Sequence, residues 1–296
     1  MSLIFFINGS FVSEKDARIA ATDLGLLRGY GIFEYFRTYG GKPFHLYDHL
    51  IRLKSSAEHI GMPLPYSLEE FAQIVEKVIE KNRFIEAGIK IIVTGGESSD
   101  QLFPENKPSV LVLIAPFHPY AARFYELGIK LISTTLPRSI PQAKTTHYIP
   151  AIVSLKKAKE KGGDDALFLG ADGEILESTT SNFFAFIEDR LVTSSSNEIL
   201  LGITREVICK ISPFEVEIRP IFYKELPSFT EAFICSSSRE IMPVTEIDGQ
   251  KIGSGQVGSR IKELQKLFTT YTESATWDSA PLQGQYNPRC RKTFFV

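Results

Sequence analysis

Three polar features between residues 144 and 205 carry residue types that can do chemistry. The first is Lys144, which stands in a mostly uncharged segment between a proline-containing loop and an expected helix. Desolvation in such a place lowers the pKa of an amine, and a neutral amine can form a Schiff base with an aldehyde. The alternative interpretation is a surface lysine, one of the 33 basic residues of the chain.

The second feature is Glu177, which follows an expected β-hairpin 33 residues after Lys144. A carboxylate held against the ring nitrogen of pyridoxal phosphate keeps that nitrogen protonated, and the ring then draws electrons from a substrate carbanion more effectively. A lysine and such an acid are therefore an expected pair for this cofactor. Taken alone, Glu177 is better explained as the solvated end of a hairpin.

The third feature is Gly202-Ile203-Thr204, where Thr204 leads into an expected helix. Backbone N–H groups and a hydroxyl at a helix N-terminus form a cradle for phosphate, although a plain N-cap has the same sequence. Arg52 can add a bidentate contact to that phosphate, and Ser236-Ser237-Ser238 offers further hydroxyls after a strand. Each signal is weak alone, but their order and spacing together favour a pyridoxal phosphate site.

Other common chemistries lack their motifs. The five histidines and three cysteines show no cluster with metal-ligand spacing, so we expect no metal. The chain has neither a P-loop nor the elbow of a serine hydrolase. The glycines at positions 25, 29 and 31 precede an expected strand rather than a helix, unlike those of a dinucleotide-binding fingerprint.

Length and charge describe an ordinary globular protein. The chain has 296 residues, 43% of them hydrophobic, and a formal net charge of −2, so we expect about two domains. Near-neutral charge gives no reason to expect nucleic acid or a membrane as a partner. No segment approaches the roughly 18 apolar residues of a membrane span, the start lacks a signal peptide, and the cysteines are scattered. We therefore expect a cytoplasmic protein.

The hydrophobic pattern predicts an N-terminal α/β domain over residues 1–115. It has a β-rich start, two amphipathic helices and two further strands. The first helix shows apolar residues at spacings of three and four between Leu46 and Ile60, and the second begins with a capping box at Ser67 and Glu70. This organisation is typical of a compact α/β unit.

A second, larger domain is expected over residues 125–271. Prolines in the segment 116–124 interrupt the periodicity and indicate a linker. Strands and turn signals then alternate around a helix that begins at Ile149, and a last amphipathic helix covers 261–271. Residues 272–296 are polar and aperiodic, so we expect a loosely ordered tail there.

Together these residues resemble the class IV, fold-type IV pyridoxal-phosphate enzymes. That family holds branched-chain aminotransferases, D-amino acid aminotransferases and 4-amino-4-deoxychorismate lyases. The resemblance covers roughly residues 4–270, and the matching segments are Phe33-Glu34, His49-x-x-Arg52-Leu53, Lys144, Glu177-x-x-x-Ser181-Asn182-Phe183-Phe184 and Leu201-Gly202-Ile203-Thr204-Arg205. It implies a smaller N-terminal α/β domain, a larger C-terminal pseudo-barrel domain, pyridoxal 5′-phosphate in the cleft between them, and a homodimer.

The resemblance also implies a role for each matching position. Lys144 corresponds to the Schiff-base lysine that carries the proton, and Glu177 to the acid on the pyridine nitrogen. Tyr148 resembles the tyrosine near the phenolic oxygen of the cofactor. The positions that match the phosphate-binding residues are Arg52, Ile203, Thr204 and Ser237.

The residues that recognise the substrate are less well defined. D-amino acid aminotransferases carry an Arg-x-His motif after the strand at 89–94, and residues 95–104 of this chain contain neither residue. A substrate carboxylate needs a charged donor in a dry pocket, and Arg28 and Lys90 are our candidates, although each can instead face solvent. Phe33 is the third residue expected in the substrate site.

The expected activity is transamination between a neutral or branched-chain amino acid and a 2-oxo acid such as 2-oxoglutarate. Lys144 would move the α-proton. Three alternatives remain open: a D-amino acid aminotransferase, a lyase that forms 4-aminobenzoate and pyruvate, and a cofactor carrier without turnover. The lyases usually have threonine or serine where this chain has Glu34, which favours an aminotransferase.

Overall fold

The computed structural model describes residues 2–136, 138–274, 282 and 290–292. The described residues fall into two compact units. The first holds residues 2–118 and Ala143–His147, and the second holds the described residues of Pro119–Gln142 and those from Tyr148 to residue 292. Lys144 therefore groups with the first unit, although its place in the sequence lies within the expected second domain. No helix in the described part of the chain is long and apolar enough to cross a membrane.

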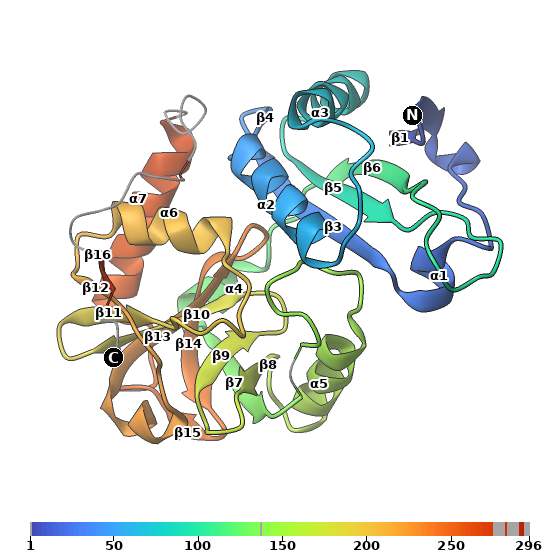
Figure 1. Cartoon of the computed structure of the whole chain (residues 1–296). Coiled ribbons are helices and arrows are strands. Elements are labelled where there is room, and N and C mark those ends of the chain that lie inside the picture. The colour runs from blue at the N-terminus through green and yellow to red at the C-terminus, as the bar shows by residue number, and fades with distance from the viewer. Residues whose placement is uncertain (1, 137, 275–281, 283–289, 293–296) are drawn as a thin grey trace. The chain divides into compact units, whose positions relative to one another are not determined.

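The first unit is built on one antiparallel sheet. Its strands are β1 (Ile4–Ile7), β2 (Ser10–Ser13), β3 (Gly31–Tyr39), β4 (Lys42–Pro43), β5 (Ala87–Thr94) and β6 (Ser109–Pro116). They follow the order β2-β1-β6-β5-β3-β4. The helices are η1 (Glu14–Asp16), α1 (Leu24–Arg28), α2 (Leu46–His59) and α3 (Leu68–Asn82). Helices α2 and α3 cover one face of the sheet (Figure 1).

The sequence pattern explains why α2 and α3 pack on this sheet. Leu50 and Leu53 of α2 and Phe71 and Val75 of α3 are fully buried in the core of the unit. Each such side chain stabilises the fold by roughly 1.5–3 kcal/mol. The capping box of α3 is confirmed, because Ser67 and Glu70 each accept a hydrogen bond from the backbone N–H of the other.

Helix α1 was not expected from the glycine-rich pattern around it. The buried carboxylate of Asp23 caps its start by accepting a 2.7 Å hydrogen bond from the N–H of Gly25, and it also accepts one from the Thr94 hydroxyl at 2.8 Å. Gly29, with a φ of 68°, ends the helix. Asp23 thereby fixes α1, which carries Arg28, to the end of β5.

The second unit contains a sheet that closes on itself. The strands of the closed part are β7 (Ile129–Thr134), β8 (Asp165–Leu169), β9 (Ile175–Ser178), β10 (Asn182–Ile187), β13 (Phe229–Ser236) and β14 (Glu240–Ile247). They pair in the order β13-β14-β7-β8-β9-β10, and β10 pairs back with β13. This closed arrangement confirms the predicted pseudo-barrel.

Further strands and helices surround this barrel. The strands are β11 (Arg190–Thr193), β12 (Val216–Ile218), β15 (Gln250–Lys251) and β16 (Cys290–Lys292). The helices are α4 (Ala122–Leu127), α5 (Ile149–Glu160), α6 (Ile203–Ile211), η2 (Tyr223–Ser228) and α7 (Ser259–Glu273). Helix α4 begins inside the segment 116–124 that we expected as a linker.

The expected tail over residues 272–296 is only partly described. Its first two residues continue α7, and β16 pairs in parallel with β12. Residues 275–281, 283–289 and 293–296 lie outside the described part of the chain.

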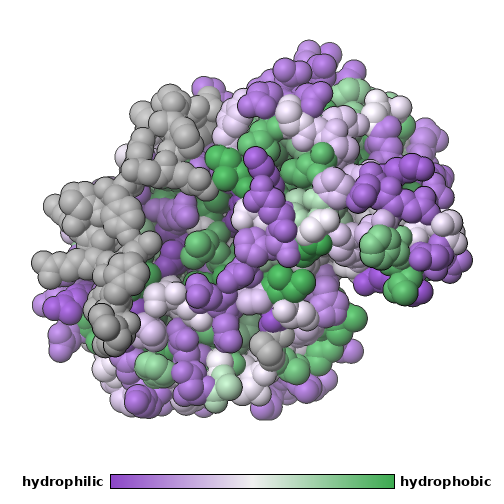
Figure 2. Space-filling model, in the orientation of Figure 1, coloured by the Kyte–Doolittle hydropathy of each residue, from purple (hydrophilic) through white to green (hydrophobic). Residues whose placement is uncertain are grey.

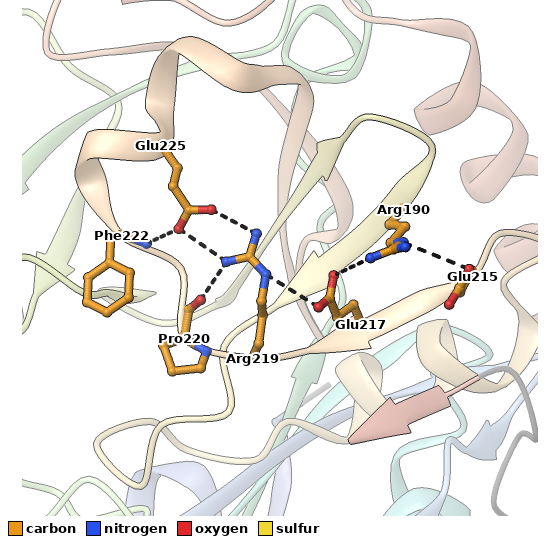
Figure 3. A network of polar contacts seen from close by, with 7 residues as sticks. All are labelled: Arg190, Glu215, Glu217, Arg219, Pro220, Phe222 and Glu225. Atoms are coloured by element: carbon orange, nitrogen blue, oxygen red, sulfur yellow. Dashed lines mark hydrogen bonds and ion pairs between the residues drawn. The ribbon is translucent and has the colours of Figure 1, made fainter. Parts of the chain in front are cut away.

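A row of ion pairs connects β11, β12 and η2 (Figure 3). Glu217 of β12 lies 3.6 Å from both Arg190 and Arg219, and Arg219 reaches Glu225 of η2 at 2.8 Å. Because these side chains are partly exposed, each pair contributes no more than about 1 kcal/mol. This row is therefore a suitable place for control substitutions.

Candidate active site

Three described residues of the second unit, Arg138, Leu200 and Asn182, donate hydrogen bonds to the Glu177 side chain. Its Oε1 accepts one from Nη1 of Arg138 at 2.9 Å. Its Oε2 accepts two, from the N–H of Leu200 at 3.2 Å and from the amide of Asn182 at 3.4 Å. The side chain is 6% exposed. The position and direction of this carboxylate are therefore fixed.

The start of α6 packs against the same carboxylate support. The amide of Asn182 also donates to the carbonyl of Leu200 at 2.7 Å. A Cβ atom on Gly202 would lie 2.2 Å from Oδ1 of Asn182, so a larger residue would displace the asparagine. Gly202 is thus required for the close approach of α6 to the residues that hold Glu177.

The N-terminus of α6 has the properties of an anion site. Gly202 is its N-cap and offers no side chain to bond the first backbone N–H groups, unlike Ser67 at the start of α3. Ile203 and Thr204 form the buried first turn. First-turn N–H groups without a side-chain cap, a hydroxyl and the positive end of the helix dipole together favour a bound phosphate.

Arg205 anchors this helix start to the barrel. Its guanidinium is buried and donates to the carbonyl of Ser194 at 2.9 Å and to the Thr193 hydroxyl at 3.3 Å. Both partners are neutral. The cation thus adds positive charge next to the first turn of α6, at the end of β11.

Ser237 lies at the same end of the barrel as Glu177. It occupies the turn between β13 and β14. Asn182, at the start of β10, is paired with Glu177 on one side and with Cys235, near the end of β13, on the other. The hydroxyls of Ser178 and Ser181 in the neighbouring turn are buried and have no hydrogen-bond partner among the described residues.

Tyr148 lies beside the same group of strands. It is the residue before α5, and it packs against a buried cluster formed by Ala151, Phe168, Leu176 and Ile199. Leu176 directly precedes Glu177 in β9. Within the second unit, Tyr148 thus packs near the strand that carries Glu177, and Ser237 lies at the same end of the barrel.

Lys144 is fixed to β3 and α2 of the first unit through its backbone. Its carbonyl accepts a 2.8 Å hydrogen bond from the N–H of Phe33, and its own N–H donates to the Ser56 hydroxyl at 3.1 Å. Its Nζ lies 4.6 Å from the centre of the Phe33 ring, and the Nζ of Lys90 lies 5.7 Å from that centre. Lys144, Phe33 and Lys90 thus meet at one aromatic ring.

Arg52 is paired with Glu34, a partner that the sequence did not reveal. Its Nε and Nη2 donate to the two oxygens of Glu34 at 2.8 and 2.7 Å, and Nδ1 of His49 lies 2.8 Å from the same carboxylate. Burial would raise the pKa of Glu34, but Arg52 and His49 outweigh it and lower that pKa to about 2. Nε and Nη2 are two of the three nitrogens that carry the five N–H donors of a guanidinium.

His49 is held as a neutral ring in the same group. Burial lowers its pKa, and the charges of Arg52 and Lys144 lower it further, while Glu34 opposes the shift. Its Nδ1 therefore donates to Glu34, and its Nε2 carries a lone pair. That Nε2 is buried and has no hydrogen-bond partner in the described part of the chain.

Arg28 lies at the end of α1. It is the last residue of α1, its side chain is exposed, and it donates to the carbonyl of Leu27 at 3.0 Å. Its role in the substrate site stays a prediction.

The chain matches known proteins over most of its length. Residues 31–247 match the family model of amino-transferase class IV. A putative branched-chain-amino-acid aminotransferase of Methanocaldococcus jannaschii is 34% identical over 89% of this chain and 94% of that protein. A D-alanine aminotransferase of Staphylococcus epidermidis is 34% identical over 91% of this chain and 98% of that protein. The crystal structure of the Escherichia coli branched-chain amino acid aminotransferase superposes with a TM-score of 0.86. It is 26% identical in sequence and covers 91% of this chain and 94% of its own chain.

The chain therefore belongs to the class IV aminotransferase family. It is an enzyme that depends on pyridoxal 5′-phosphate, and its substrates are amino acids and 2-oxo acids. The fold predicted from the sequence is confirmed by the same comparison.

Proposed function

We propose that this enzyme transfers the amino group of a neutral or branched-chain amino acid to a 2-oxo acid such as 2-oxoglutarate. The observation that carries the proposal is the meeting of Lys144 and Lys90 at the ring of Phe33. An apolar ring suits a hydrocarbon side chain, and a cation beside it suits a carboxylate. A neutral amino acid needs both next to the amine that moves its proton.

The described residues fit pyridoxal phosphate. The uncapped start of α6 supports phosphate binding by Ile203 and Thr204, with Ser237 and Arg52 as further contacts. Glu177 would lie on the ring nitrogen, and Tyr148 near the phenolic oxygen. When bound, the cofactor supplies an electron sink for the carbanion of the substrate.

The residues of the chain would supply the remaining steps. Lys144 would hold the cofactor, and its Nζ would accept the α-proton of the amino acid and return it at the cofactor carbon. The Phe33 ring reduces the access of water to that nitrogen, and the two backbone hydrogen bonds of Lys144 fix the base of the moving side chain. The three donors on Glu177 prevent it from rotating during the cycle.

Arg28 and Lys90 are the proposed contacts for the substrate carboxylate. Lys90 is exposed on β5 and lies near Phe33. Arg28 is presented at the end of α1, which Asp23 fixes in place. A guanidinium and an ammonium can each pair with a carboxylate, although only the guanidinium does so with two parallel hydrogen bonds.

Glu34 supports an aminotransferase over the lyase. It accepts hydrogen bonds from both Arg52 and His49 in a fully buried position. A threonine or serine, the usual residue of the lyases there, carries one hydroxyl and no charge, so it could not hold both partners.

A substrate panel tests the proposal. The purified enzyme is incubated with L- and D-amino acids, and with 2-oxoglutarate or pyruvate as acceptor, and the new amino acid is measured. We expect amino transfer from L-leucine, L-isoleucine or L-valine to 2-oxoglutarate. Transfer from D-alanine alone would establish the D-amino acid alternative, which the similarity to a D-alanine aminotransferase favours. Pyruvate release from aminodeoxychorismate without an acceptor would establish the lyase. If no amino acid is converted at all, the remaining alternative is a cofactor carrier without turnover.

We also propose that the enzyme is a homodimer. Ile149, Ile152 and Val153 of α5 are exposed at a helical spacing of three and four, and Figure 2 shows hydrophobic residues on the surface in the region of α5. A contiguous apolar face of this kind favours a protein partner. Sedimentation velocity should give twice the mass of one chain, and a monomer at micromolar concentration would contradict the proposal.

A further inference from the structure

One buried carboxylate connects two turns of the second unit. Asp165, the first residue of β8, is fully buried, and its Oδ2 lies 2.6 Å from Nη1 of Arg239. Its Oδ1 accepts a 2.6 Å hydrogen bond from the hydroxyl of Thr179. The sequence motifs described above include neither Asp165 nor Arg239.

Both partners of Asp165 stand close to a proposed cofactor residue. Thr179 follows Glu177 by two positions, in the turn between β9 and β10, and Arg239 follows Ser237 by two positions, in the turn between β13 and β14. The pairing of β10 with β13 places both turns at the same end of the barrel. One carboxylate therefore holds the turn of Glu177 and the turn of Ser237.

Arg239 is fixed through its side chain and its backbone. Its guanidinium lies 5.4 Å from the centre of the Tyr120 ring, and its carbonyl accepts a 3.2 Å hydrogen bond from the Tyr125 hydroxyl. Its N–H donates to the carbonyl of Ser236 at 3.2 Å. Burial would lower the pKa of Arg239, but Asp165 and Tyr120 raise it, so the side chain keeps its charge. The whole turn that carries Ser237 is thereby held.

Stability alone is a weak reason for such a pair. Removing two charges from water costs so much that apolar residues of similar volume often stabilise a fold as well or better. A charged pair differs from apolar packing because it fixes the direction of both side chains. Fixed direction matters most where neighbouring groups must match the shape of a ligand.

We propose that Asp165 and Arg239 are positioning residues for the cofactor phosphate. Their ion pair holds the turn that carries Ser237 at a fixed distance from the turn that follows Glu177. The residue that contacts the phosphate and the residue that contacts the ring can then reach the same cofactor molecule. The inference rests on the proposed role of Ser237 as a phosphate contact. Loosening the pair should therefore weaken the phosphate contact more than the ring contact.

Two ligands that differ only in the phosphate test this inference. The apoenzyme is titrated with pyridoxal phosphate and with pyridoxal, and the ratio of the two affinities is compared between variants. Asp165→Asn keeps the size of the side chain and an acceptor for Thr179, but it removes the charge. Asp165→Asn and Arg239→Gln should each lower the affinity for pyridoxal phosphate about tenfold, as the loss of one hydrogen bond to a charged group does. The affinity for pyridoxal should change much less.

Conservative and remote variants separate positioning from a purely structural role. Arg239→Lys keeps the charge and should retain more of the affinity ratio than Arg239→Gln. This comparison does not need Asp165→Asn, so it still tests the inference if that variant does not fold. Glu231→Gln removes another mostly buried ion pair of this unit, with Arg260 of α7 at 3.1 Å, and should leave the ratio unchanged. An equal loss of affinity for both ligands in the Asp165 and Arg239 variants would overturn the inference.

Ser237→Ala separates the proposed phosphate contact of Ser237 from the proposed positioning role of Asp165 and Arg239. A lowered ratio in Ser237→Ala together with normal ratios in the Asp165 and Arg239 variants would overturn the positioning role alone. An unchanged ratio in Ser237→Ala would overturn the phosphate contact itself, and with it the basis of the inference.

Discussion

Arg138 donates a 2.9 Å hydrogen bond to Glu177, and the two side chains are only 18% and 6% exposed. At this burial the pair is only weakly screened by solvent. Arg138 lies six residues before Lys144 in the sequence. The loop that leads to the proposed catalytic lysine thus also contacts the acid proposed for the ring nitrogen.

Replacing Arg138 should weaken cofactor binding at the proposed site without abolishing it. In Arg138→Ala, Glu177 keeps its hydrogen bonds from Leu200 and Asn182, so we expect roughly a tenfold fall in kcat and in cofactor affinity, as for one lost charged hydrogen bond. Arg138→Lys should fall between this variant and the wild type. Steady-state kinetics and cofactor titration measure both effects. Arg190→Ala, in the exposed ion-pair row, is the control, and an equal loss there would remove the special role of Arg138.

The buried Glu34 should make stability depend on acid pH. Its folded pKa of about 2 lies below its ordinary value of 4.5, so its contribution is complete above about pH 4.5 and is lost as the pH falls towards 2. Glu34→Gln leaves Arg52 without its carboxylate and should lower the free energy of unfolding by roughly 3–5 kcal/mol at neutral pH. Urea unfolding at several pH values gives the difference between the two proteins.

That difference should shrink below pH 4.5. A difference that stays constant down to pH 2.5 would contradict the assigned charge state of Glu34. His49 adds a second acid-sensitive contribution, because its lowered pKa means that stability declines as the pH falls below its ordinary value of 6.5. Because Glu34 raises the pKa of His49, Glu34→Gln also changes this contribution, so the comparison is repeated with His49→Asn in both proteins.

The sequence predicted the local structure well because the signals for it are local. The capping box at Ser67 and Glu70 and the 3.6-residue periodicity after Leu46 each depend on residues within one helix, and both were confirmed. Helix α1 was missed because its cap, Asp23, is held in place by a hydrogen bond from Thr94, which is distant in sequence. Contacts of this kind leave no periodic trace.

The same limit applies to the candidate site. Position and residue type made Lys144, Glu177 and Thr204 candidates, because the chemistry that they permit can be predicted from their spacing. The partners that orient such residues, Arg138 for Glu177 and Glu34 for Arg52, became visible only in three dimensions. A buried charged residue has no sequence signature until its counter-charge is located.

Gly202→Ala should disturb both the start of α6 and the support of Glu177 in the proposed cofactor site. The new Cβ would lie 2.2 Å from Oδ1 of Asn182, so the asparagine must move away from Leu200 and Glu177. We expect a loss of about 1–3 kcal/mol in unfolding free energy, typical of overpacking, and weaker cofactor binding. Gly173→Asn is the matched control, since a Cβ there meets nothing within 4 Å and asparagine tolerates its positive φ. A variant at 202 that resembles this control would contradict the packing argument.

Arg28→Ala and Lys90→Met should each raise the KM for the amino acid. If both residues contact the substrate carboxylate, each loss should cost roughly tenfold or more in kcat/KM, because a charged hydrogen bond is removed. Cofactor affinity should stay at the wild-type value, since neither residue is assigned to the cofactor. Initial-rate kinetics with a single amino acid donor provide the comparison. A residue whose replacement leaves KM unchanged does not belong to the substrate site.

Reductive trapping tests the central assignment, the role of Lys144, most directly. Treating the enzyme with borohydride in the presence of its cofactor links the cofactor permanently to the lysine that holds it, and peptide mass spectrometry then identifies that lysine. We predict the label on Lys144, and no trapped cofactor in Lys144→Ala, although that variant should still bind the cofactor through Glu177, Thr204 and the start of α6. A label on Lys90 or on any other lysine of the wild-type enzyme would contradict the account.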